Sequence, residues 1–101
     1  MAQSAREQAK QLLADVPEEY VFWCQDGRIL RNLRDLGEAL ETMTDETFTY
    51  HANTEKNDFA NWVRDIIKDE KLARDLSRSN NRALATKVVR DREAYLIARL
   101  A

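Results

Sequence analysis

The sequence contains one cysteine, one proline, one histidine and two glycines in 101 residues. The single thiol, Cys24, excludes an internal disulfide, so we expect a reducing, cytoplasmic location. So little glycine and proline argues against an all-β sandwich, whose many turns need both residue types. No apolar run approaches the roughly 20 residues of a membrane-spanning helix, and the N-terminus lacks the layout of a signal peptide. These shortages predict a cytoplasmic domain that does not enter a membrane.

Hydrophobic residues make up 44% of the chain and charged residues 34%, a balance too apolar for intrinsic disorder. The length is that of a single domain, here residues 1–101. The patterns described below predict a mainly α fold of the α+β class, a small bundle of about five to six helices with one short β-hairpin. Within it we expect an N-terminal helix over 1–16, a core block over 18–76 and a basic amphipathic helix over 80–101.

Cap residues and apolar spacing predict where the first helices begin. Ser4 and Glu7 form a capping box, and Pro17 ends the apolar pattern that follows. Asn32 is a good N-cap, with Asp35 in the first turn of the helix. Four apolar residues then recur three or four positions apart, which is typical of an amphipathic helix: Leu33, Leu36, Leu40 and Met43.

A run of aromatic and β-branched residues from Tyr20 to Cys24 favours a β-strand. Asp26-Gly27 is a strong tight-turn signal, and residues 28–31 can return as a second strand. The competing interpretation is an irregular apolar loop. In a strand, alternation places Tyr20, Phe22 and Cys24 on one side and Trp23 on the other. We expect a helix to cover one of these faces, or a partner to find it exposed.

The second half of the chain predicts further helices. Thr44 caps a short helix from Asp45 to about His51, Asn57 or Asp58 starts the next, and Asp69 caps another. The last helix, from about Arg82 to Leu100, has an apolar stripe that residues 91–93 interrupt, which indicates packing at its two ends or against a second chain. That stripe comprises Leu84, Ala85, Val88, Val89, Tyr95, Leu96 and Leu100. The predicted core side chains are Phe22, Leu36, Leu40, Phe48, Phe59, Trp62, Ile66 and Leu72.

His51 is the one side chain whose ordinary pKa is near neutrality, which makes it the first candidate for chemistry. It could serve as a general base oriented by Asp58, or as a metal ligand. Catalysis also needs a nucleophile or substrate within reach, and a structural metal site needs about four ligands. The sequence offers neither, so we predict no catalytic residue, metal or cofactor. We instead expect His51, Asn57 and Asp58 to form a structural clamp between adjoining helices.

Residues 18–76 resemble a family of small prokaryotic proteins catalogued as a domain of unknown function. The resemblance lies in the aromatic run with its Asp26-Gly27 turn, the leucine stripe that follows, the segment Phe48-Thr49-Tyr50-His51, and Asn57-Asp58-Phe59 with Trp62. It continues through the stretch from Asp69 to Leu76, while the first helix and the basic tail lie outside it. The resemblance implies a mainly helical domain and brings no activity, cofactor or catalytic residue.

Charge is divided unequally along the chain. Residues 1–70 carry 8 basic and 15 acidic residues, whereas residues 71–101 carry 8 basic and 3 acidic ones. Our leading hypothesis is a non-enzymatic protein–protein interaction module, including self-association through the terminal helices. The alternative is a nucleic-acid-associated factor that binds phosphates through its basic C-terminal third. The polyanion-binding residues would be Lys71, Arg74, Arg78, Arg82, Lys87, Arg90 and Arg92. A third use of these charges is to hold the tail on the acidic body of its own chain.

Overall fold

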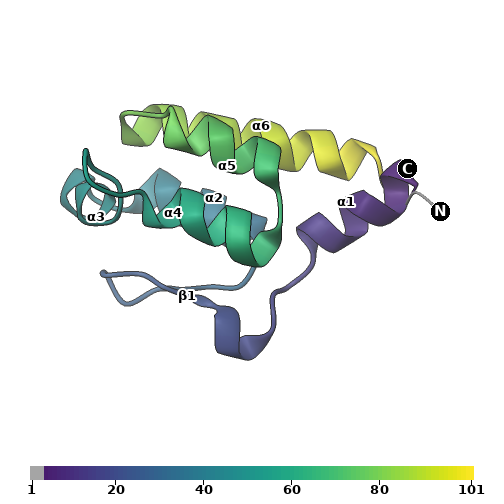
Figure 1. Ribbon diagram of the computed structural model, residues 1–101, viewed down its shortest axis with the longest axis horizontal. Coiled ribbons are helices and arrows are strands. Elements are labelled where there is room, and N and C mark those ends of the chain that lie inside the picture. Colours follow the sequence, from purple (N-terminus) through teal and green to yellow (C-terminus); the bar gives the residue numbers. More distant parts are fainter. Residues whose placement is uncertain (1–3) are drawn as a thin grey trace.

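Six α-helices and one two-stranded antiparallel hairpin make up the part of the protein that the computed structural model describes, residues 4–101 (Figure 1). The predicted fold class, a small mainly helical bundle with one hairpin, is confirmed. In chain order the elements are α1 (Ala5–Leu13), a 3₁₀ turn (Glu18–Tyr20), β1 (Phe22–Trp23), β2 (Ile29–Leu30), α2 (Leu33–Thr42), α3 (Asp45–His51), α4 (Asp58–Trp62), a π-helical turn (Val63–Ile67), α5 (Glu70–Ser77) and α6 (Arg82–Ala98).

Every one of these six helices begins at a polar residue whose side chain accepts a hydrogen bond from a backbone N–H in the first turn. The six bonds measure 2.8–3.1 Å. Each satisfies a donor that the helix itself cannot, a stabilisation of about 1 kcal/mol per cap. The caps therefore fix the helix starts locally, and they are Ser4, Asn32, Thr44, Asn57, Asp69 and Asn81.

The core lies where α2, α4, α5 and α6 meet. α6 packs along α2 and also contacts α5 and α1, while the hairpin lies on the opposite side of the bundle (Figure 1). Leu36, Leu40, Phe59 and Leu72 are fully buried at this junction. Of the predicted core side chains only Ile66 is not buried; it is half-buried and packs against the edge of the core. The other predicted members, Phe22, Phe48 and Trp62, are buried.

The hairpin pairs Phe22 with Leu30 and Trp23 with Ile29. Gly27 has a φ of +95°, a left-handed conformation that glycine adopts without strain, and its N–H donates to the Cys24 carbonyl at 3.0 Å. The prediction that Tyr20 belongs to the strand was wrong. Tyr20 ends the 3₁₀ turn, where its carbonyl accepts a 2.8 Å hydrogen bond from the Trp62 indole. Tyr20 therefore lies outside the ladder, whose first pair is Phe22 with Leu30.

The prediction for α6 needs a second correction. Leu84 and Tyr95, expected inside, are exposed, whereas Arg92 and Glu93, expected to interrupt the buried stripe, face inward. The inward position is tolerated because both side chains are paired with opposite charges there. Apolar periodicity alone misassigns such a helix, since two charged residues take the place of apolar ones at the interface.

None of the helices within residues 4–101 combines the length and the apolar character that crossing a bilayer requires.

Candidate functional site

The histidine site lies at the junction of α3 and α4. His51 is the last residue of α3, Asp58 is the first of α4, and a backbone bridge between Ala52 and Asn57 closes the loop that joins them. The Nδ1 atom of His51 lies 3.0 Å from the Asp58 carboxylate. The structure thus brings together two members of the predicted clamp, because the short closed loop holds His51 and Asp58 next to each other.

The second ring nitrogen of His51 is also engaged. The backbone N–H of Gln25 donates to Nε2 at 2.9 Å, so Nε2 carries a lone pair and the proton of a neutral ring lies on Nδ1, directed at Asp58. A general base needs a free lone pair aimed at a substrate. Here that lone pair accepts the hydrogen bond from the hairpin backbone. The ring therefore connects α3, the hairpin and the start of α4.

The surroundings of His51 seal it from solvent. Only 4% of the residue is exposed, and the rings of Phe22, Tyr50 and Phe59 lie 4.9–5.2 Å from the imidazole centroid. This is a packed aromatic cluster with one polar edge turned toward Asp58. A substrate would have to displace a core side chain to reach the ring.

Asp58 has a second cation beside it. The Lys56 ammonium donates to the carboxylate at 2.8 Å, at the exposed end of the site. Burial alone would raise the pKa of the Asp58 carboxyl, but hydrogen bonds from Lys56 and His51 outweigh burial and hold that pKa below its ordinary value. The hydrogen bond to Asp58 raises the pKa of Lys56 in turn. The carboxylate therefore stays ionised at neutral pH and keeps the imidazole proton on Nδ1.

Asn57, the third residue of the predicted clamp, bonds in two directions. Its side-chain oxygen accepts from the Ala60 N–H at 3.0 Å, and its amide nitrogen donates to the Leu76 carbonyl at 3.1 Å. The first bond caps α4 and the second ties this cap to the end of α5. All three residues of the predicted clamp thus connect neighbouring elements.

A second reactive centre would need a reactive thiol or a cluster of metal-ligand side chains. Cys24 is buried beneath the hairpin, and burial is the main cause that raises the pKa of its thiol, so the unreactive neutral form is favoured. Within residues 4–101 no cluster of three or more His, Cys, Asp or Glu side chains is arranged to hold a metal ion.

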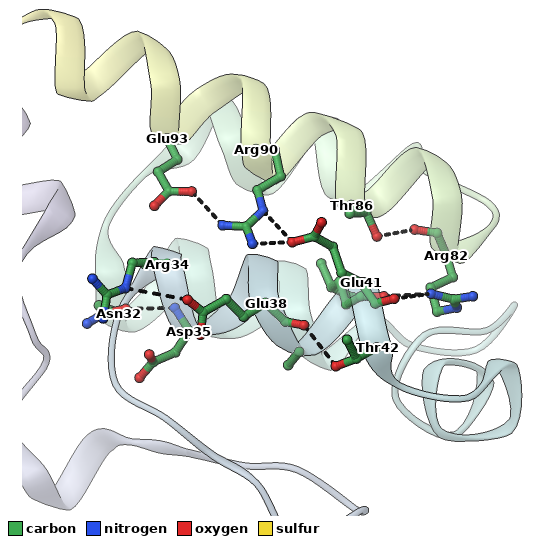
Figure 2. A network of polar contacts seen from close by, with 12 residues as sticks. Asn32, Arg34, Asp35, Glu38, Glu41, Thr42, Arg82, Thr86, Arg90 and Glu93 are labelled. Carbon is green, nitrogen blue, oxygen red and sulfur yellow. Dashed lines mark hydrogen bonds and ion pairs between the residues drawn. The ribbon is translucent and has the colours of Figure 1, made fainter.

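The basic C-terminal third is joined to the acidic body by three arginines of α6. Arg82 donates to Asp45 at 2.9 Å, and Arg90 lies between Glu41 of α2 and Glu93 of its own helix (Figure 2). The bonds to Asp45 and Glu41 join α6 to α3 and α2, and they pair charges that lie 37 and 49 positions apart in the sequence. These bonds support the third interpretation of the charges, in which the basic tail packs on the acidic body of its own chain.

Gly37 lets the Arg90 side chain of α6 pass close to the backbone of α2. A Cβ atom at that position would lie 3.0 Å from the Arg90 guanidinium, so only glycine leaves the arginine room to cross α2 without moving. Gly37 had no predicted role, because a glycine inside a helical pattern carries no local signal of the side chain that crosses it.

The third arginine, Arg92, makes a pair that the sequence analysis missed. It donates to both oxygens of Asp69, at 2.8 and 3.2 Å, and Asp69 is only 2% exposed. The same carboxylate caps α5 through the Leu72 N–H at 3.1 Å. Asp69 was recognised as a cap, but its partner lies 23 residues away, beyond the reach of any local pattern.

Four of the seven proposed polyanion-binding residues remain to be placed. Lys71 pairs with Asp75 and Lys87 with Asp91, both one turn along their own helices and largely exposed. Arg74 and Arg78 have no carboxylate within ion-pair distance among residues 4–101. The structure therefore divides the predicted polyanion surface. Arg82, Arg90 and Arg92 pair with acidic residues of the body, and the other four predicted residues lie at the surface.

The hairpin presents two aromatic rings to solvent. Trp23 is 71% exposed and Tyr20 is 53% exposed, while Phe22 and Cys24 between and beside them point into the core. Three residues of chain span at most about 11 Å, so the backbone positions of Tyr20 and Trp23 lie close together. All three charged residues between 17 and 27 are acidic, namely Glu18, Glu19 and Asp26. We call Glu18, Glu19, Tyr20 and Trp23 the hairpin surface.

Comparisons with known proteins yield no relative: no family model, no curated protein and no solved structure matches the chain. The resemblance to a domain of unknown function stays a prediction.

Proposed function

We propose that this protein is a non-enzymatic interaction module that binds a basic segment of a partner protein through its hairpin surface. The observation that carries the proposal is the exposure of Trp23, the most exposed of the large hydrophobic side chains among the described residues. Tryptophan and tyrosine are the residue types that dominate binding energy at protein interfaces. Trp23 lies on a strand that is anchored from behind, and Tyr20 ends the 3₁₀ turn before it, an arrangement suited to that use.

Charge defines the chemistry of the partner. Glu18 and Glu19 precede Tyr20 directly, whereas Asp26, in the turn after Trp23, already pairs with Arg28. An arginine or lysine that stacks on the Trp23 ring gains about 0.5–1 kcal/mol from the cation–π contact, and neighbouring carboxylates hold further cations. The occupant is therefore a segment rich in arginine or lysine, rather than an acidic or purely apolar one.

The histidine site supports a binding role over an enzymatic one. Both nitrogens of His51 are engaged within the chain and the ring is sealed by aromatic neighbours, so the chemistry that the sequence suggested for it has no access to a substrate. We propose the cytoplasm as the compartment, on the expectation that a single free thiol is kept in a reducing environment.

Binding of a fluorescein-labelled hexa-arginine peptide, followed by fluorescence anisotropy, tests the proposal. We expect saturable binding that Trp23→Ala weakens at least fivefold, with hexa-glutamate not binding. Tyr95→Ala is the matched control, because it removes an exposed aromatic ring from α6 and leaves the hairpin intact. Equal affinity of the two variants would refute the hairpin surface as the binding site.

A second copy of the chain is the competing occupant of the hairpin surface. Sedimentation equilibrium of the protein alone would detect such a dimer. Self-association through the terminal helices has less support, because α6 packs on α2, α5 and α1 of its own chain. We therefore expect a monomer at concentrations up to hundreds of micromolar. A dimer that Trp23→Ala dissociates would show that a second copy of the chain covers the hairpin surface, and the proposal of a basic partner would then be wrong.

The nucleic-acid alternative has less support from the geometry. Arg82, Arg90 and Arg92 are engaged with acidic residues of the body, so a phosphate backbone would have to compete with pairs already made. A mobility shift on mixed DNA and RNA at low salt would favour this alternative, provided that it weakens steeply as salt is added.

A further inference from the structure

A cavity of about 360 Å³ opens where α1, the π-helical turn, the start of α5 and α6 come together. Five of its lining side chains are cationic, although the protein as a whole carries a net charge of −2. These five residues are Arg64, Lys68, Lys71, Arg74 and Arg92. The cavity shares no lining residue with the histidine site or with the hairpin surface.

The acids in the cavity do not neutralise this charge. Asp69 is already held by both donors of Arg92, so that pair contributes no net charge. The other lining carboxylate is that of Glu70, against four further lining cations, two of which pair with carboxylates outside the lining. An anion that enters the cavity would therefore meet a surplus of positive charge.

The four cations are available to a ligand. Lys68 and Arg74 have no carboxylate within ion-pair distance among residues 4–101. Arg64 pairs with Asp65 and Lys71 with Asp75, but the side chains of the two cations are more than half exposed. Exposed pairs of this kind contribute little to stability, so a doubly charged ligand can take over their donors.

The backbone at the cavity favours the same charge. Lys68 has a φ of +74°, a left-handed conformation that is unusual for a residue with a side chain, and it directly precedes the cap of α5. A glycine would satisfy this turn with less strain. The turn instead carries a lysine, and the positive end of the α5 dipole lies beside it.

We infer that this cavity binds a phosphate-bearing small molecule. Arginine forks recognise the oxygens of a phosphate in pairs, and lysines add point charges that suit a dianion. The volume is at the lower end of the range for small-molecule sites, which fits a phosphate with a small organic group. The inference is independent of the proposed function, because it concerns different residues and a different ligand.

Isothermal titration calorimetry at low salt tests this inference, with inorganic phosphate, pyrophosphate and glycerol 3-phosphate as separate probes. We expect one site with a dissociation constant below 1 mM for glycerol 3-phosphate. Weaker binding of inorganic phosphate would show that the organic group is recognised as well. If none of the three probes binds below 10 mM, the inference is wrong.

Lys68→Gly is the decisive variant because it removes a cation and relieves the left-handed backbone at once. The variant should fold at least as well as the unaltered protein, so a loss of binding cannot come from unfolding. We expect its affinity to fall at least tenfold. Arg78→Gln is the matched control, since it removes one charge from an exposed arginine outside the cavity, and its affinity should stay within twofold.

Two outcomes would overturn the inference. An equal loss in Lys68→Gly and Arg78→Gln would mean that the protein attracts phosphate by overall charge and has no site. Tighter binding of a single-stranded 12-mer DNA than of any small phosphate, with the same dependence on Lys68, would assign the cations to nucleic acid.

Discussion

Replacing Arg92 by methionine is the most direct test of how α6 is held on the body. Methionine keeps the length of the aliphatic stem and removes the guanidinium, so Asp69 is left as a charged group only 2% exposed without its ion-pair partner. Breaking one partner of a buried pair typically costs 3–5 kcal/mol. The Arg92 side chain is 15% exposed, which places this pair near the buried limit.

For a domain of this size, whose total stability is about 5–15 kcal/mol, a loss of this magnitude is large. Each kcal/mol lowers Tm by about 4–8 °C, so the Arg92→Met variant should melt at least 12 °C below the unaltered protein. Urea denaturation followed by circular dichroism at 222 nm gives the free energy of unfolding. Lys87→Met on the same helix is the control, because Lys87 is 68% exposed and pairs only along the surface.

A double-mutant cycle separates the pair from its surroundings. Asp69→Asn keeps the capping oxygen and removes the charge, so the double variant Asp69→Asn/Arg92→Met should be less destabilised than the sum of the two singles by about 2–3 kcal/mol. A single variant within 1 kcal/mol of the unaltered protein, or an additive double, would refute the view that this pair fastens α6.

Three further predictions concern the histidine site and the α2–α6 interface. His51→Phe keeps a ring in the aromatic cluster but removes both the acceptor of the Gln25 N–H and the hydrogen bond to Asp58, so we expect a loss of about 2 kcal/mol in urea denaturation, about 1 kcal/mol for each bond; an unchanged midpoint would contradict the clamp. The pKa of Asp58 is lower in the folded protein than its ordinary value near 3.8, so the stability from this carboxylate is present above that value and is lost as the pH falls through the lower, folded pKa. Asp58→Asn should therefore destabilise the protein at pH 7 and less so at pH 2, and parallel pH profiles would speak against the shift. Gly37→Ala should be close to neutral in thermal melts because the better helix former displaces Arg90, whereas in an Arg90→Ala background it should stabilise by about 1 kcal/mol; equal effects in both backgrounds would exclude the contact.

Local signals predicted most of the fold. The caps at Asn32 and Thr44 and the turn at Gly27 each depend on residues within four positions of one another, so the sequence displays them directly. The apolar stripe of α2 is equally local, and all of its predicted members are buried. Elements set by neighbouring residues can therefore be predicted from one sequence.

Contacts between distant segments could not be predicted. Asp69 reads as a cap and Arg92 as an interruption, and only the packing of α6 on the start of α5 shows that they are partners. The same packing exposes Tyr95, which periodicity had placed inside. The link from His51 to Asp58 was expected from their closeness in sequence, whereas the bond from Gln25 was not, because it joins the hairpin to α3 across 26 positions.

The way the hairpin is fastened has a consequence for the thermodynamics of recognition. A free two-stranded ribbon would sample many conformations, and a partner would have to select one of them. Here Phe22 packs in the aromatic cluster. The Trp62 indole donates a hydrogen bond to the Tyr20 carbonyl, and His51 accepts one from the backbone N–H of Gln25. The backbone that carries Trp23 has thus lost its freedom during folding. Little conformational entropy is left to be lost at the moment of association, so a small contact area can produce a useful affinity.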